Sequence, residues 1–236
     1  MEVHDVCYDY YGKRVATCSS DQMIRVYDEH GRKTAEWKAH LGSIWRLVWA
    51  HPEFGQVLAS CSFDRKVCVW EDLGDGEELS QQRNGGGKLQ AELVEAKDSL
   101  HDLKFAPKHL GLRLATCGSD RHVRVYEAPD VMDQSSWLLL HEFETDASSP
   151  SAGGRPGAPQ CLAWNSSAMD SMMLAVGLAD GAVYLWAFHE QHNSWSCLLG
   201  FEALEAGRSH SAHLDCVHDV AWAPDVGRSY HLLATA

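Results

Sequence analysis

The chain has 236 residues, 45% of them hydrophobic, and its formal net charge at neutral pH is −13. A chain of this length can bury one sizeable core, and its scattered Lys and Arg argue against binding to a phosphate backbone, which needs a basic stripe. No apolar run approaches the ~18 residues of a membrane span and no signal peptide begins the chain, so we expect a soluble nucleocytoplasmic protein.

The expected strands follow one order that recurs along the chain. In the first copy, strands at residues 4–8 and 16–20 lead to Asp21, and further strands are expected at 23–26 and 34–37. Runs of apolar, β-branched and aromatic residues indicate these strands, and a short acceptor such as Asp suits the tight turn between the second and third. An aromatic residue follows each Asp by six positions, and the four pairs are Asp21 with Tyr27, Asp64 with Trp70, Asp120 with Tyr126, and Asp180 with Trp186.

The spacing of this repeat predicts the fold class. The shortest interval between successive Asp residues fits the ~40–45 residues of a four-stranded WD-repeat blade, and the longer intervals need only surface insertions. We therefore predict an all-β WD-repeat β-propeller. A fifth first strand starts at His218, Thr235 falls on the repeat's hydroxyl position, and the next Asp is due beyond Ala236. The predicted propeller is thus open and incomplete, with about four blades and the start of a fifth.

The repeat also predicts the organisation of one partial propeller over residues 1–236. Two Gly-, Ser- and Pro-rich stretches cannot pack a core and are predicted to be flexible loops. The expected units are blade 1 at about 1–38, blade 2 at 39–97 with a loop at 73–88, blade 3 at 98–146, a loop at 147–159, blade 4 at 160–212, and the start of blade 5 at 213–236.

One set of polar residues is predicted to form a buried structural tetrad in the second blade. His40, Ser60, Asp64 and Trp70 stand where Asp can bond His, His a hydroxyl, and the hydroxyl an indole N–H, so that each buried polar atom has a partner. The other blades hold partial tetrads, in which at least one position is changed: Thr17, Asp21 and Tyr27; Thr116, Asp120 and Tyr126; Asp180 and Trp186. We expect all of them to act as scaffolding.

No catalytic, cofactor-binding or metal-binding residues are predicted. The cysteines include no C-x-x-C pair, and Cys18, Cys61 and Cys117 recur at one repeat position, which favours small core fillers over metal ligands or disulfides. The recurring His-Asp pairs favour a structural role in the same way. The run from His189 to His192 has the wrong spacing for a zinc protease motif, and the glycines before Lys88 lack the rest of a phosphate-binding loop. We expect no enzyme.

Several longer phrases resemble a particular family. The run WAHPEFGQVLASCSFDR at residues 49–65 is similar to the paired scaffold propellers shared by the nuclear pore and vesicle coats. Within that group, KFAPKH at 104–109, VRVYEAPDVM at 123–132 and VHDVAWAP at 217–224 resemble the WD-repeat nucleoporin in the short arm of the Y-shaped outer-ring complex. The EAPDVM run separates it from the vesicle-coat sibling.

The resemblance implies a mechanism of assembly. The family's six-bladed propeller is left open, and a helical-solenoid nucleoporin inserts a short β blade that completes the ring, which is a form of β-augmentation. By this analogy the acceptor lies beside the first blade, and the candidate edge strand runs through His4, Asp5, Val6, Cys7, Tyr8, Asp9 and Tyr10. The implied partners are that solenoid and other outer-ring nucleoporins, with no direct nucleic acid and no transmembrane segment.

The predicted function is a non-catalytic scaffold of the nuclear pore outer ring at the nuclear envelope, supporting nucleocytoplasmic transport of mRNA and protein. Membership of a SEA-type complex that relays amino-acid status to the TOR kinase, at the vacuolar or lysosomal surface, is the first alternative. A vesicle-coat propeller and a WD-repeat substrate receptor of a ubiquitin ligase are further alternatives. A receptor would need basic residues to grip a peptide, for which the candidates are Arg25, Arg65, Arg121 and Arg124.

Overall fold

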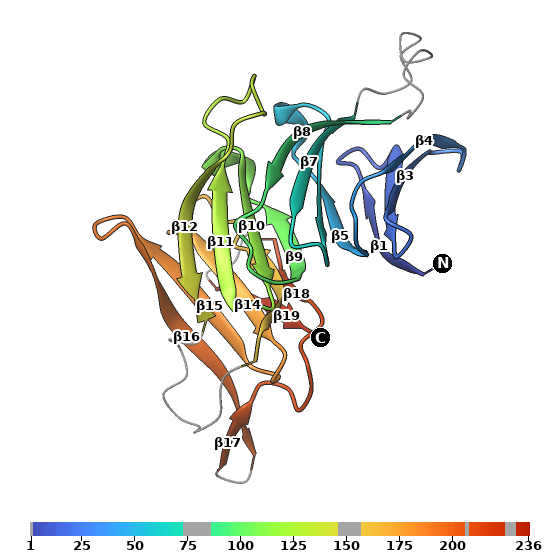
Figure 1. The fold of residues 1–236 in the computed structure, drawn as a ribbon. Coiled ribbons are helices and arrows are strands. Elements are labelled where there is room, and N and C mark those ends of the chain that lie inside the picture. The colour runs from blue at the N-terminus through green and yellow to red at the C-terminus, as the bar shows by residue number, and fades with distance from the viewer. Residues whose placement is uncertain (1, 73–85, 146–156, 206–207, 225–229) are drawn as a thin grey trace.

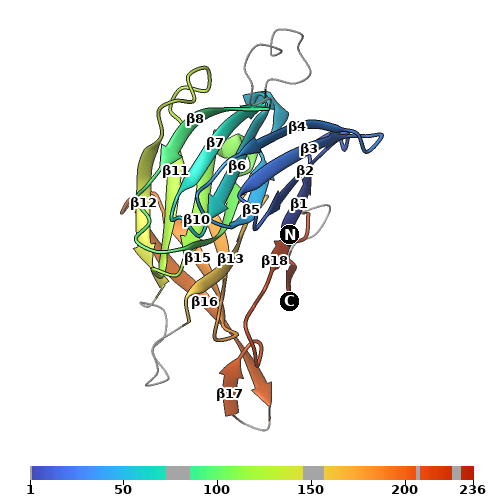
Figure 2. The ribbon, with the colours of Figure 1, turned by 45° about the vertical axis from the view of Figure 1, so that its right-hand side comes forward.

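The protein is built of antiparallel sheets that follow one another in chain order. The structure, a computed structural model, describes residues 2–72, 86–145, 157–205, 208–224 and 230–236. These residues form four sheets of at least four strands and one two-stranded sheet, and the sheets stand side by side (Figures 1 and 2). No helix in the described ranges is long and apolar enough to cross a membrane.

Within each sheet the strands pair in sequence order. The first sheet contains β1 (Val3–Tyr8), β2 (Arg14–Ser19), β3 (Met23–Asp28) and β4 (Lys33–Lys38). The second contains β5 (Ile44–Trp49), β6 (Val57–Ser62), β7 (Val67–Asp72) and β8 (Gly87–Leu93). The third contains β9 (Leu100–Phe105), β10 (Arg113–Gly118), β11 (His122–Glu127) and β12 (Leu138–Glu144).

The fourth and fifth sheets complete the described chain. The fourth contains β13 (Pro159–Trp164), β14 (Met173–Leu178), β15 (Val183–His189), β16 (Ser194–Glu205) and β17 (Arg208–Ser211), and the fifth contains β18 (Val220–Trp222) and β19 (Leu233–Thr235). The end of β16 and β17 form a hairpin that extends away from the other strands (Figures 1 and 2). The all-β, open propeller with four blades and part of a fifth is confirmed.

The predicted loops at 73–88 and 147–159 lie mostly outside the described residues, but their last residues are strand. Gly87 pairs with Asp72 at the start of β8, and a Cβ there would meet the Trp37 ring at 2.6 Å. Glycine is needed because the indole lies on the backbone. Pro159 begins β13, where a missing N–H is tolerated, and its carbonyl accepts a hydrogen bond from His101 Nδ1 at 3.0 Å.

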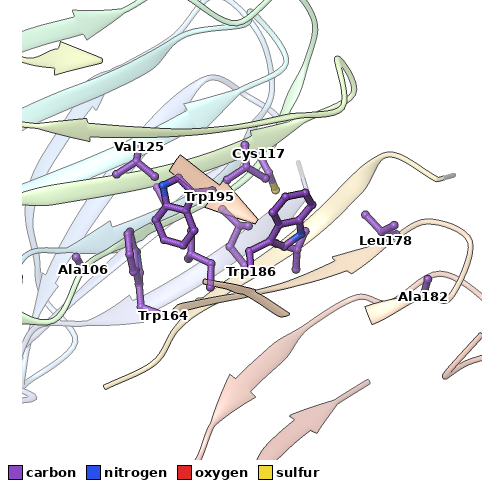
Figure 3. Packing of buried hydrophobic residues seen from close by; sticks show 13 residues of the cluster. Ala106, Cys117, Val125, Trp164, Leu178, Ala182, Trp186 and Trp195 are labelled. Carbon is purple, nitrogen blue, oxygen red and sulfur yellow. The ribbon is translucent and has the colours of Figure 1, made fainter. Parts of the chain in front are cut away.

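Each sheet buries one face against the next sheet. Between the third and fourth sheets, Cys117 and Val125 pack against Trp164 and Trp186 (Figure 3). Ala16, Cys18, Ile24 and Val26 of the first sheet pack in the same way with Leu47 and Trp49 of the second. The middle strands are therefore apolar, because interior strands are covered by neighbouring sheets.

The first strand of each of the first four sheets carries an irregularity at one position. The register shifts between Val3 and Asp5 in β1, and equivalent shifts occur in the later sheets. A β-bulge of this kind leaves one residue unpaired and redirects its side chain. The four bulged residues are His4, Trp45, His101 and Gln160. Together with Arg46 and His218 they line one cavity between the first strands, which we call the central channel. In the first and third sheets, the bulge thus directs the His that precedes the recurring Asp, His4 or His101, into the central channel.

We predict that Leu162→Ala lowers the free energy of unfolding by about 2–5 kcal/mol, because it leaves a cavity in the core between the third and fourth sheets. Leu162 is fully buried there. Urea denaturation provides the measurement. The exposed Leu198→Ala is the control and should change stability by less than about 0.5 kcal/mol, and equal effects of the two variants would contradict this account of the core.

Candidate functional site

The four members of the predicted tetrad in the second sheet are joined by hydrogen bonds. His40 Nδ1 lies 3.1 Å from Asp64 Oδ2, and His40 Nε2 lies 2.8 Å from Ser60 Oγ. Trp70 Nε1 donates to the same Ser60 oxygen at 3.0 Å. With Nδ1–H donating to the carboxylate and the Ser60 hydroxyl donating to Nε2, every polar atom of this chain is satisfied. This series of hydrogen bonds joins the segment before β5 to β6 and β7.

Asp64 is the charged end of this tetrad. Burial raises the pKa of its carboxyl, but hydrogen bonds from His40, Leu41 N and Lys66 N outweigh burial and lower the pKa to about 2. The Leu41 bond is 2.9 Å and the Lys66 bond is 3.1 Å. Hydrogen bonds that favour the ionised form have this effect. The carboxylate therefore organises both the imidazole and the turn backbone.

The predicted partial tetrads are not joined in this way. Thr17 Oγ1 reaches only the Arg25 carbonyl, at 3.5 Å, and Thr116 Oγ1 and Trp186 Nε1 are buried without a hydrogen-bond partner among the described residues. The role that the four turn Asp residues share is local. Asp21, like its counterparts, accepts from the backbone N–H two residues later. A connected tetrad needs the His, which the second sheet supplies as His40. His213 has the same place before the fifth sheet, where its Nε2 lies 2.7 Å from Thr235 Oγ1.

Ion-pair triads, which the sequence analysis missed, replace the tetrad in the first and third sheets. Arg25 Nη2 lies 2.7 Å from Asp21 Oδ2, and Arg25 Nε lies 2.6 Å from Glu36 Oε1. In the third sheet, Arg124 Nη2 lies 2.7 Å from both Asp120 and Glu142. The sequence signal is an Arg four residues after the turn Asp, but the Glu comes from another strand.

These triads also bear on the peptide-receptor alternative. Arg25 and Arg124 were candidates for gripping a peptide, yet both guanidinium groups are held between two carboxylates, and the Arg124 side chain is fully buried. Arg65 and Arg121 occupy turns with positive φ, 69° and 64°, where they follow the turn Asp. Two of the four arginines are therefore held in ion pairs and two lie in turns. This arrangement does not favour binding of a peptide by these arginines.

The recurring Asp of the first strands links neighbouring sheets. Asp5 Oδ2 accepts from Leu47 N of the second sheet at 3.1 Å, and Asp102 Oδ2 accepts from Leu162 N of the fourth sheet at 2.8 Å. The two indoles Trp164 and Trp222 donate to carbonyls of the preceding sheet. Main-chain groups at the sheet boundaries are satisfied by these side chains, so the His-Asp pairs have a structural role.

In the second sheet, Arg46 occupies the position that this Asp has in the first and third sheets. Its guanidinium lies 3.7 Å from Asp5 and 3.9 Å from Asp102, and it donates to the His218 carbonyl at 3.2 Å. Burial lowers the pKa of Arg46, but the carboxylates of Asp102, Asp5 and Asp219 outweigh burial and raise it. One cation therefore connects the second sheet with the first, third and fifth sheets across the channel.

Burial sets the protonation of several other groups inside the protein. It raises the pKa of Asp102 to about 6, although nearby Lys104, Leu162 N and Arg46 act to lower it. Burial also raises the pKa of Cys18 and Cys161 to about 12, so these thiols are protonated at neutral pH, unlike nucleophilic thiolates. Among the described residues, no group of three His, Cys, Asp or Glu side chains could hold a metal ion.

One face of the first sheet is uncovered, and this is the candidate interaction face. Val6 pairs opposite Thr17, and Tyr8 opposite Val15, so these side chains lie on the face away from the second sheet. Val6 is 52% exposed, whereas Leu47, Leu103, Leu162 and Val220, which occupy its position in the other sheets, are at most 3% exposed. Tyr8 is 67% exposed, against 9% for Trp49. In the later sheets the preceding sheet provides this cover.

The residues of the predicted edge strand therefore point in several directions. His4 lines the channel, Asp5 binds the second sheet, and Cys7 packs with the core between the first two sheets. Asp9 accepts from backbone N–H groups of its own turn, and Tyr10 contacts His51. Only Val6 and Tyr8 of this segment belong to the interaction face, to which Val15, Thr17, Arg25 and Tyr27 contribute from β2 and β3.

Comparison with known proteins agrees with the repeat and with the resemblance. The family model described as WD domain, G-beta repeat matches residues 1–28 and 31–71. Nucleoporin SEH1-A of Xenopus laevis is 45% identical over 99% of this chain and 63% of its own length, and nucleoporin SEH1 of Homo sapiens is 44% identical over the same shares. Over nearly its whole length the chain is therefore similar to proteins named nucleoporin SEH1. It spans slightly less than two thirds of the length of these relatives.

We predict that Ser60→Ala destabilises the chain by about 1–3 kcal/mol for each buried group left unpaired, namely the Trp70 N–H and His40 Nε2. Urea denaturation followed by tryptophan fluorescence measures this loss. The matched control is Thr17→Ala, at the same strand position of the first sheet, whose hydroxyl bonds only one distant carbonyl. A loss for Ser60→Ala no larger than for Thr17→Ala would argue against the buried hydrogen-bond chain.

The Asp64 carboxyl should also give the stability a specific pH dependence. Its pKa of about 2 in the folded chain lies below the ~3.9 of an unfolded chain, so its stabilising contribution is complete above pH ~3.9 and is lost as the pH falls through about 2. The stability difference between wild type and Asp64→Asn should be largest near neutral pH, at about 2 kcal/mol, and shrink towards pH ~2. Asp130→Asn in an exposed turn is the control, and a difference that does not change with pH would refute the assignment.

Proposed function

We propose that the chain is a non-catalytic scaffold subunit of the nuclear pore outer ring, the Y-shaped complex. The observation that carries this proposal is the uncovered face of the first sheet in a chain that is 44–45% identical to proteins named nucleoporin SEH1. The rest of the described fold is devoted to packing sheet on sheet, and its recurring polar residues serve hydrogen bonds and ion pairs between strands.

The proposed partner is a helical-solenoid nucleoporin that donates a β blade onto this face. Val6 and Tyr8 occupy positions that a preceding sheet covers everywhere else in the chain, so a sheet is the cover that their surroundings fit. The contact would be made face to face, because β1 already pairs with β2 along one edge and its first residues lie at the channel. The described backbone thus favours face packing over pairing along β1.

Among the alternatives, the vesicle-coat propeller is disfavoured by the nucleoporin names of the relatives. A SEA-type complex that regulates the TOR kinase, at the vacuolar or lysosomal surface, would use the same face and the same kind of partner. Affinity capture of the chain from extract, with quantitative mass spectrometry, separates these assignments. We expect stoichiometric recovery of outer-ring nucleoporins, and recovery of coat subunits or a ubiquitin ligase in their place would contradict the proposal.

We predict that Val6→Asp weakens binding of the solenoid nucleoporin at least tenfold, because a carboxylate would be buried unpaired in the contact. Co-expression of the chain with the outer-ring solenoid of the same organism, followed by gel filtration and calorimetry, measures this. Val94→Asp, at an exposed apolar residue directly after β8, is the control and should bind as wild type.

Both variants should melt as the wild-type chain does, since both residues are exposed in it. Wild-type affinity for Val6→Asp would show that the solenoid binds elsewhere. Failure of the wild-type chain to bind the solenoid would overturn the proposed partner itself.

A further inference from the structure

The interaction face contains a charged group as well as apolar side chains. Arg25 pairs opposite Thr17, which in turn lies opposite Val6, so the Asp21–Arg25–Glu36 triad is on the same face. The Arg25 side chain is 16% exposed and the two carboxylates are 28% and 29% exposed. Arg25 Nη1 also donates to Ser19 Oγ at 3.2 Å. The guanidinium is thus fixed by three acceptors before any partner arrives.

The third sheet shows what happens to such a triad under a covering sheet. Arg124, Asp120 and Glu142 occupy the equivalent positions, and the Arg124 side chain is fully buried. The second sheet covers this face with Ala59, Cys61, Val67 and Leu93, which pack against Leu103, Leu114 and Tyr126. An ion pair can be carried into such an interior because its charges are already paired. The covering strands contribute uncharged side chains to that core, and a nearby carboxylate, Glu95 after β8, hydrogen-bonds Tyr126.

We infer that the Asp21–Arg25–Glu36 triad is an interface element, buried by an uncharged β-sheet face of the partner's blade. This inference rests on the proposed function and specifies the partner's surface. In the complex, the triad would have the environment that Arg124 has in the third sheet. Asp21 then depends on Arg25, because solvent no longer screens it, just as Asp120 is only 5% exposed beside Arg124.

The covering faces inside the chain indicate the chemistry of that blade. Each presents two alternate small residues on its second strand, and the pairs are Ala16 and Cys18, Ala59 and Cys61, Ala115 and Cys117, and Ala175 and Gly177. Each presents alternate branched aliphatic residues on its third strand, such as Val123 and Val125. The partner's blade is therefore expected to carry alternate Ala, Cys or Gly in one strand and alternate Ile, Val or Leu in the next.

The test is the affinity of the solenoid nucleoporin for Arg25→Ala, measured by calorimetry on the co-purified pair. We expect at least a tenfold loss, because Asp21 is then buried without its cation, whereas Glu36 keeps its pair with Lys33. In the free chain the triad is partly solvated, so the melting temperature should change little. The matched control is Arg32→Ala, which removes an equally short Arg–Asp pair to Asp28 in the same sheet, but with Arg32 76% exposed.

A second variant separates charge from packing. Combining Arg25→Met with Asp21→Asn and Glu36→Gln removes all three charges at similar volume, and binding should recover to within threefold of wild type. Wild-type affinity for Arg25→Ala, equal losses for Arg25→Ala and Arg32→Ala, or no recovery in the triple variant would each overturn the inference. Those results differ from failure of the proposed function, in which the unaltered chain does not bind the solenoid.

Discussion

The packing of one sheet against the next is the interaction on which the rest of this structure depends. A four-stranded sheet is too small to bury both of its faces alone, and here each sheet covers its neighbour with small and branched residues such as Ala59 and Val67, which meet Leu103 and Leu114. The apolar area removed from water in these layers is the main stabilising term. A sheet without a neighbour on one side keeps that area exposed, and the first sheet is in this position at Val6 and Tyr8.

The charged groups that enter these layers are held in pre-paired sets. The tetrad from Asp64 to Trp70 is a closed chain of hydrogen bonds, and the Arg124 triad neutralises its own charges. At the inner strands, Asp5 and Asp102 accept main-chain N–H groups of the next sheet, and Arg46 balances them across the channel. Each set brings the buried polar side chain together with an opposite charge or a hydrogen-bonding partner at a sheet boundary.

This use of the polar groups is consistent with the scaffold role proposed above. Its histidines, acids and cysteines are used in packing and in hydrogen bonds between strands, and the raised pKa of the buried thiols is unlike that of reactive groups. The uncovered face is different in kind, since it combines exposed apolar residues with the partly solvated Arg25 triad. The third sheet would expose the same combination of apolar residues and an Arg triad if the second sheet did not cover it.

The sequence by itself determined the repeat, the strands, the turn Asp residues and the four members of the second sheet's tetrad, because these features depend on spacing along one chain. It also indicated the family through phrases such as EAPDVM. It did not reveal that Thr17 and Thr116 lack tetrad partners, that Arg25 meets Glu36, or that Arg46 joins four sheets. Only the tertiary structure decided which of His4 to Tyr10 face outward, because a bulge and the cover of a neighbouring sheet, both set by residues distant in sequence, determine where each side chain lies.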